Sequence, residues 1–126
     1  MTMSEGLVRP DALSVHDGLL ALDLHLPWYR SLPISCLESV EVVVDGAPAT
    51  VTAVGVPGFT GTVAEAAASD ADWYLRDALR VSLDREGRPG AHALDVTLAV
   101  RIPYLQTAPG VALVQRATAR TEGILR

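Results

Sequence analysis

Hydrophobic residues recur at every second position along much of this chain, and this period restricts the possible folds strongly. The clearest run consists of four leucines separated by smaller or polar residues, Leu20, Ala21, Leu22, Asp23, Leu24, His25 and Leu26. Side chains of a strand point alternately to opposite faces, whereas those of a helix repeat every ~3.6 residues. The run therefore predicts a strand with one face on a core and the other on water or a partner.

The same period returns in Val40, Val42 and Val44, and Asp45-Gly46 follows directly. Asp-Gly tolerates the positive φ angles of a tight hairpin turn. The pattern predicts a hairpin whose return strand runs over residues 49–54.

A further strand is predicted from the alternating apolar residues of the segment 94–102. Residues 84–90 before it are rich in turn formers, so we expect the segment 73–83 to be its partner across that turn.

Helix is expected in one short stretch only. Pro57, Gly58 and Gly61 predict a connecting loop over 55–62, and one helical turn is expected at 63–68, capped by Thr62 with Glu65 three residues later. Short strands separated by Gly and Pro signals predict an all-β fold. We expect a two-sheet antiparallel β-sandwich, jelly-roll-like, or a barrel, with at most one short helix.

Composition indicates a single globular domain over residues 1–126. Hydrophobic residues make up 49% and charged residues 20%, and 15 acidic residues outnumber 10 basic ones. A net charge of -5 without an Arg-rich run argues against a nucleic-acid partner. No stretch approaches the ~18 apolar residues of a membrane span, and Met1 to Gly6 lack a leader pattern. We expect a cytoplasmic protein without membrane contact.

Candidate reactive groups are scattered. They are His16, His25 and His92, the adjacent Ser35 and Cys36, and the carboxylates Asp70, Asp72 and Asp77. Asp23 and His25 share a strand face and could bind an ion or a hydroxyl, although a solvated face is the more common role. One cysteine excludes an internal disulfide and a multi-cysteine zinc site. We expect no catalytic and no metal-ligating residue in this chain.

The aromatic residues occur largely as adjacent pairs, Trp28-Tyr29 and Trp73-Tyr74. Neighbours in an extended backbone point to opposite faces, so one member of each pair should face outward. Trp, Tyr and Arg are enriched at interfaces. These two pairs and Arg30 are therefore the candidate contacts to a substrate or a partner, although a hydrophobic plug over the open end of the sandwich fits the loop 26–33 equally well.

The stretch 109–126 begins with an alternating pattern, becomes polar over 115–122 and ends with Ile124-Leu125. It predicts a C-terminal arm that either frays or lies on another chain.

Four segments, Leu26–Glu38, Val42–Gly46, Trp73–Asp77 and Arg101–Tyr104, carry a resemblance that spans nearly the whole chain. In residues and order they resemble the beta (small) subunit of bacterial C-glycoside deglycosidases, also called C-deglycosylation enzymes. None of these segments is a catalytic signature.

The resemblance implies a division of labour between two chains. A larger alpha subunit with a TIM-barrel fold would hold a divalent metal, usually manganese, and the catalytic base. The enzyme would cleave the carbon-carbon bond between sugar and aglycone of 3-oxo-C-glycosides by elimination, as a lyase in flavonoid C-glycoside catabolism. A ketone at C3 acidifies the C2 proton, and a metal stabilises the resulting enolate. The small β-sandwich subunit would pack on the barrel as an auxiliary chain of a hetero-oligomer.

Two other functions compete with this one. A free-standing carbohydrate-binding β-sandwich would stack Trp28 and Trp73 on sugar rings, and a small independent hydrolase or cupin-like enzyme would need its own metal site.

Overall fold

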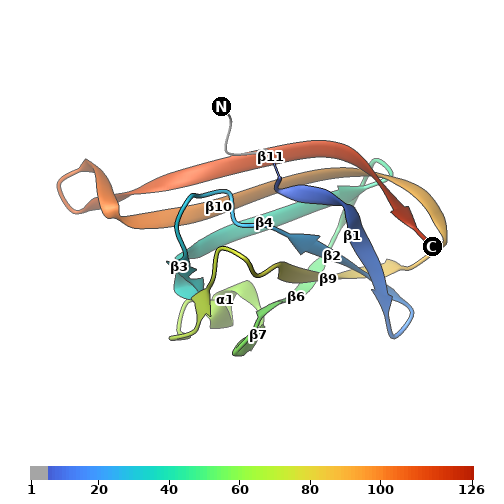
Figure 1. The fold of residues 1–126 in the computed structure, drawn as a ribbon, viewed down its shortest axis with the longest axis horizontal. Helices are drawn as coiled ribbons and strands as arrows, with labels where there is room; N and C mark the ends of the chain where they lie inside the picture. Colours follow the sequence, from blue (N-terminus) through green and yellow to red (C-terminus); the bar gives the residue numbers. More distant parts are fainter. Residues whose placement is uncertain (1–5) are drawn as a thin grey trace.

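Two antiparallel sheets face each other across a hydrophobic core in the computed structural model (Figure 1), which describes residues 6–126. The five-stranded sheet has the order β1 (Val8–His16), β2 (Leu19–Leu24), β9 (Leu79–Glu86), β6 (Val51–Val56) and β7 (Phe59–Gly61). The four-stranded sheet has the order β11 (Val111–Leu125), β10 (Gly90–Ala108), β4 (Leu37–Val44) and β5 (Ala47–Ala49). This architecture confirms the predicted all-β sandwich. The leader expectation concerned Met1–Glu5, which lie outside the described residues, and Gly6.

A third, two-stranded sheet pairs β3 (Leu32–Pro33) with β8 (Asp72–Trp73). A 3-10 turn, η1 (Ile34–Cys36), follows β3, and α1 (Val63–Ala66) follows β7. The capping box at α1 is confirmed, because Glu65 accepts a 2.9 Å bond from the Thr62 amide and the Thr62 hydroxyl accepts a 3.0 Å bond from the Glu65 amide. The expected turn of 63–68 is thus a shorter helix.

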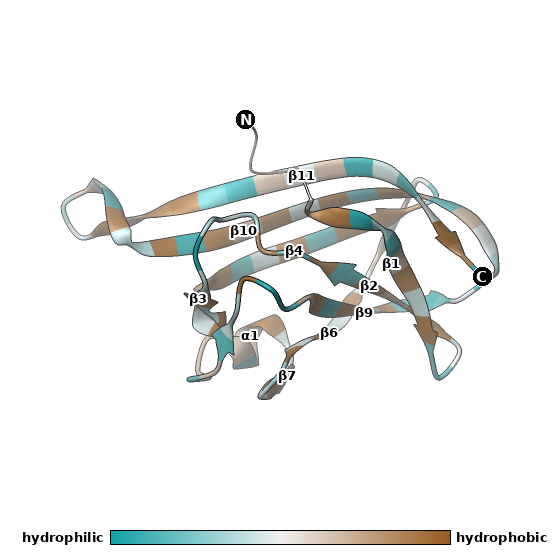
Figure 2. Cartoon of the chain, in the orientation of Figure 1, coloured by the Kyte–Doolittle hydropathy of each residue, from teal (hydrophilic) through white to brown (hydrophobic). Residues whose placement is uncertain are grey.

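The core lies between the inward faces of the two sheets. Along β2 and β9 these residues include Leu22, Leu24, Val81 and Leu83, and along β10 they include Leu94, Val96, Leu98, Val100 and Ile102, each at most 1% exposed. Figure 2 shows the resulting alternation of apolar and polar bands along β10 and β11. Inward alternation on both sheets is what allows them to stack face to face.

The predicted turn at Asp45-Gly46 is confirmed, with φ angles of 51° and 82°. Asp17-Gly18, between β1 and β2, has the same left-handed pair of angles, 54° and 80°. Both turns have positive φ at two successive positions, as type I′ hairpins require.

The expected pairing of 73–83 with 94–102 is wrong. β9 pairs with β2 and β6, whereas β10 pairs with β4 and β11 in the other sheet. Each strand has one apolar face, and crossing between the sheets lets both faces bury against the same core. The connection 87–89 is therefore a corner of the sandwich and not a hairpin turn.

Two smaller expectations also need correction. The predicted return strand over 49–54 divides at Thr50, because Ala47–Ala49 pairs with β4 and Val51 onward pairs with β9. Phe59–Gly61 forms strand β7 against β6 inside the predicted loop. Gly58, with φ of 95°, lies in the tight turn between β6 and β7.

The predicted C-terminal arm over 109–126 is a strand of this domain. β11 pairs with β10 from Ala108 opposite Val111 to Gly90 opposite Leu125. Backbone hydrogen bonds along this register satisfy the groups that a frayed arm would expose, so the stretch is paired within this chain. Its end packs under β1, where a side-chain carbon added at Gly123 would lie 2.8 Å from Leu13 Cδ1.

Candidate functional site

The loop between β2 and β3 and the outer part of β10 meet through an aromatic cluster. The Trp28 indole nitrogen donates a 2.6 Å hydrogen bond to the Tyr104 hydroxyl, across 76 residues of sequence. The Arg30 guanidinium lies 5.3 Å from the centre of the Tyr104 ring, within cation–π range. The Trp28 and Tyr29 rings lie 4.9 Å apart and are tilted by 38°. These contacts fix the loop against the outer part of β10, close to the turn of the β10–β11 hairpin.

The second aromatic pair lies beside this loop. Leu32 pairs with Trp73 in the β3–β8 sheet, and the Leu75 amide donates a 2.7 Å bond to the Ser31 hydroxyl. Trp73 is 1% exposed and its indole nitrogen donates a 2.8 Å bond to the Asp77 carbonyl, whereas Tyr74 is 56% exposed. The expectation that one member of each pair faces outward is confirmed here.

Trp73 is therefore a core residue, and the structure removes it from the candidate contacts. The apolar surface of its ring packs in the core, and its N–H group has a hydrogen-bond acceptor within the chain. Trp28 is half-buried, and Tyr29 is 60% exposed.

We use the name tyrosine surface for the exposed residues that these contacts bring together, namely Tyr29, Arg30, Tyr74, Leu75, Tyr104 and Leu105. Three of these, Leu75, Tyr104 and Leu105, were not among the residues predicted from the sequence. Tyr104 could have been found from its place in the segment Arg101–Tyr104, which resembled the family. The contact with Trp28 depends on tertiary structure.

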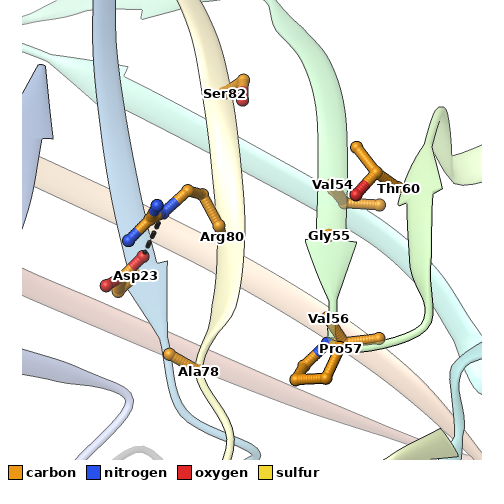
Figure 3. A pocket seen from close by; sticks show the side chains of 9 residues that line it. All are labelled: Asp23, Val54, Gly55, Val56, Pro57, Thr60, Ala78, Arg80 and Ser82. Atoms are coloured by element: carbon orange, nitrogen blue, oxygen red, sulfur yellow. Dashed lines mark hydrogen bonds and ion pairs between the residues drawn. The ribbon is translucent and has the colours of Figure 1, made fainter. Parts of the chain in front are cut away.

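A shallow cavity of about 310 Å³ lies on the outer face of the five-stranded sheet (Figure 3). Its rim has an ion pair between Arg80 Nε and Asp23 Oδ1, 3.1 Å apart, with the Thr60 and Ser82 side chains on neighbouring strands. The Asp23 carboxylate, which the sequence grouped with His25 as a place for an ion or a hydroxyl, thus already has the Arg80 guanidinium as a partner.

His25 has a buried Nδ1 atom without a hydrogen-bond partner among the described residues. Burial, together with the charge of Arg9, holds the pKa of His25 below its usual value, which favours the neutral ring. No carboxylate is hydrogen-bonded to the Nδ1 atom of His25 among the described residues, so the ring lacks the acid that would orient it as a general base.

His92 has a structural role instead. Its Nε2 lies 2.7 Å from the Arg88 carbonyl oxygen and its Nδ1 lies 2.7 Å from an Asp45 carboxylate oxygen. The carbonyl of Arg88, and then Asp45, raise the pKa of His92. Both partners are acceptors, so both ring nitrogens can donate only in the protonated ring. His92 thus links the Asp45 turn to the corner between the sheets, and protonation of its ring would satisfy both contacts.

The remaining candidates do not form a reactive group. Cys36 is 2% exposed, and burial raises the pKa of its thiol, which is the reverse of what a nucleophile needs. Asp70 and Asp72 are exposed and Asp77 is half-buried. Within residues 6–126, no group of three or more His, Cys, Asp or Glu side chains could hold a metal ion.

Residues 17–104, which contain both aromatic pairs and the Trp28–Tyr104 contact, match the family model described as "C-glycoside deglycosidase beta subunit". The chain belongs to this family. The match covers β2 to β10 except for the outer end of the β10–β11 hairpin, and it confirms the resemblance found in the sequence.

Curated relatives are likewise named as beta subunits of deglycosidases. The chain is 36% identical over 109 residues to a "3'-dehydrocarminate deglycosidase beta subunit" from Microbacterium sp, covering 82% of each chain. It is 35% identical over 103 residues to a C-glycoside deglycosidase beta subunit from Microbacterium trichothecenolyticum, covering 79% of each. A beta subunit from Arthrobacter globiformis is 27% identical over 124 residues, covering 94% of this chain and 95% of that one.

Membership of a C-glycoside deglycosidase beta subunit family implies a partner subunit. No helix in the part of the chain that the structure describes has the length and apolar character to cross a membrane.

Proposed function

We propose that this chain is the small, auxiliary subunit of an enzyme that cleaves the carbon-carbon bond between sugar and aglycone of 3-oxo-C-glycosides. Its partner would be a larger, metal-dependent TIM-barrel subunit, and the complex would act in the cytoplasm in the catabolism of flavonoid C-glycosides. The observation that carries the proposal is the family match over residues 17–104.

The distribution of reactive groups supports an auxiliary role. The described side chains of this subunit do not fit the metal that the family resemblance implies, since no group of three or more potential ligands occurs among residues 6–126. We therefore assign the metal and the catalytic base to the large subunit and derive no step through them here.

The proposed substrate class follows from chemistry and from one relative. A ketone next to a C–H bond makes that proton acidic enough for a positioned base to remove, which permits elimination of a carbon leaving group. The Microbacterium relative is named for 3'-dehydrocarminate, and the prefix denotes oxidation at position 3'. An oxidised sugar is the class of substrate that we carry over to this chain.

The contribution of this subunit would be to bind and stabilise the catalytic chain. Tyr29, Tyr74 and Tyr104 are 60%, 56% and 47% exposed, and large aromatic side chains of this kind anchor interfaces when a partner covers them. Trp28 and Arg30 hold Tyr104 in place before any partner binds.

The test is reconstitution. The chain is expressed alone and together with the large subunit of a C-glycoside deglycosidase, and aglycone release from a 3-oxo-C-glycoside is measured. We expect activity from the complex and none from this subunit alone. Full activity of the large chain without this subunit would refute the auxiliary role, and an inactive complex would refute the reaction.

The alternative of a carbohydrate-binding module is weakened by the structure. Trp73, one of its two proposed stacking residues, is buried, and Trp28 is half-buried with its N–H bonded to Tyr104. The cavity at Asp23 and Arg80 gives this alternative a polar site, but no ring in its lining could stack on a sugar.

A further inference from the structure

We propose that the partner subunit docks on the tyrosine surface and on the outer end of the β10–β11 hairpin beside it. We call this outer end, residues 103–114, the ribbon. The inference rests on the proposed function for the existence of a large catalytic subunit, and it adds where that subunit binds.

Among residues 6–126, no further strand of its own sheet lies beside the ribbon. β4 pairs with β10 only as far as Leu37 opposite Val100, whereas β11 follows β10 to Val111 opposite Ala108. Figure 1 shows the hairpin reaching past the end of β4. The register also shifts twice between Ile102 and Ala108. An isolated two-stranded hairpin is marginally stable in water, so a covering surface would stabilise this one.

The composition of the ribbon is unusual for a projecting hairpin. Residues 102–115 contain no charged side chain, in a chain where charged residues make up 20%. Leu105, Val111 and Val114 are 38%, 53% and 41% exposed. Exposed strands that have no partner normally carry charges that prevent association. An uncharged, apolar ribbon is therefore suited to burial against another protein.

Tyr104 joins the ribbon to the tyrosine surface. Its hydroxyl accepts the bond from Trp28 and its ring lies under the Arg30 guanidinium, so its orientation is fixed within this chain. A side chain that is already ordered loses little conformational entropy when a partner covers it. Tyr104 is thus a pre-ordered aromatic group at the place where the ribbon and the tyrosine surface meet.

The charges on this face indicate the chemistry of the partner. Arg30 belongs to the tyrosine surface and Arg76 follows its Leu75 in the chain. Both are exposed, and the ion pairs found among residues 6–126 include neither of them. The fitting partner is a catalytic subunit with an apolar groove for the ribbon and carboxylates at its rim to meet these guanidinium groups.

The opposite end of the molecule provides a matched control. Ile124 lies on β11 like Val111 and is 56% exposed against 53%, but it pairs with Ala91 at the start of β10 and not with Ala108 at its end. Val111→Asp and Ile124→Asp therefore place the same charge on the same strand at similar exposure.

Binding of each variant to the large subunit is measured by titration, and the thermal unfolding of each isolated small subunit is followed by circular dichroism. We expect Val111→Asp to weaken binding by about tenfold or more and Ile124→Asp to change it by less than about twofold. Equal effects, or a larger effect of Ile124→Asp, would overturn the inference while leaving the proposed function intact. A wild-type chain that does not bind the large subunit would overturn both.

Hydrogen exchange on the wild-type complex tests the inference even if Val111→Asp unfolds the ribbon. We expect the amides of 103–114 to become protected when the large subunit binds, with little change at the turn 17–18. Unchanged exchange in the ribbon would overturn the inference without any variant.

Discussion

The Trp28 indole and the Tyr104 hydroxyl are joined by a 2.6 Å hydrogen bond. This contact ties the loop after β2 to the base of the ribbon. Trp28 lies in the loop between β2 and β3, whereas Tyr104 lies in β10 of the four-stranded sheet, so their contact joins two parts of the tyrosine surface.

Changing Trp28 to Ala should weaken assembly or activity more than it lowers the stability of the isolated subunit. The substitution leaves Tyr104 without its donor, but Trp28 is only half-buried, so the core loses little. Binding to the large subunit and thermal unfolding of the small one measure the two effects. Tyr104→Phe is the milder companion because it removes the hydroxyl and keeps the ring. If both properties fell equally in Trp28→Ala, Trp28 would be a core residue.

The stability of the subunit should depend on pH through His92. Its pKa in the folded chain is raised above the ordinary value of 6.5, first by the Arg88 carbonyl and then by Asp45. The stabilisation is therefore complete below about pH 6.5 and is lost as the pH rises through the folded pKa. The pKa of Asp45 is lowered from 3.8, first by His92 and then by the Ala93 amide, so its contribution is lost as the pH falls below that value.

His92→Gln tests this dependence. Denaturant unfolding of the wild-type and variant chains at about pH 5.5 and about pH 8.5 should show a larger difference in the free energy of unfolding at the lower pH, where the imidazolium bonds exist. Asp45→Asn should reduce that difference as well, because it removes the charged acceptor. The same difference at both pH values would show that His92 is neutral in the folded chain.

Leu98→Ala should destabilise the domain by about 2–5 kcal/mol. Leu98 is 0% exposed on the inward face of β10, so the truncation leaves a cavity between the sheets. Leu19→Ala is the control, since Leu19 is 41% exposed and its change should cost about 0.5 kcal/mol or less. Urea unfolding of both variants gives the comparison, and a Leu98 variant as stable as the control would contradict the assigned core.

The Cys36 thiol should be unreactive in the folded chain. Burial raises its pKa, and a thiol must ionise to react with an aromatic disulfide reagent. We expect little absorbance change in native buffer and complete reaction in denaturant. Rapid reaction in native buffer would show that the packing of η1 against β10 opens readily and exposes the Cys36 thiol.

Local patterns alone predicted several of the strands of this protein, although not all of them. Alternation marked β2, β4 and β10, and Asp45-Gly46 and the capping box at Thr62 formed as expected, because hairpin turns and caps depend on a few neighbouring residues. The turn at Asp17-Gly18 carried the same signal and was overlooked in the sequence.

Tertiary packing determined which strands pair and which aromatic residues are exposed. Alternation shows that β9 and β10 each have an apolar face, but it does not show whether those faces lie in one sheet or across the core from each other. For the same reason the period of two gives opposite directions to Trp73 and Tyr74 without saying which is buried. The contact of Trp28 with Tyr104 joins positions far apart in the chain, and only burial of both sheets against one core brings them together.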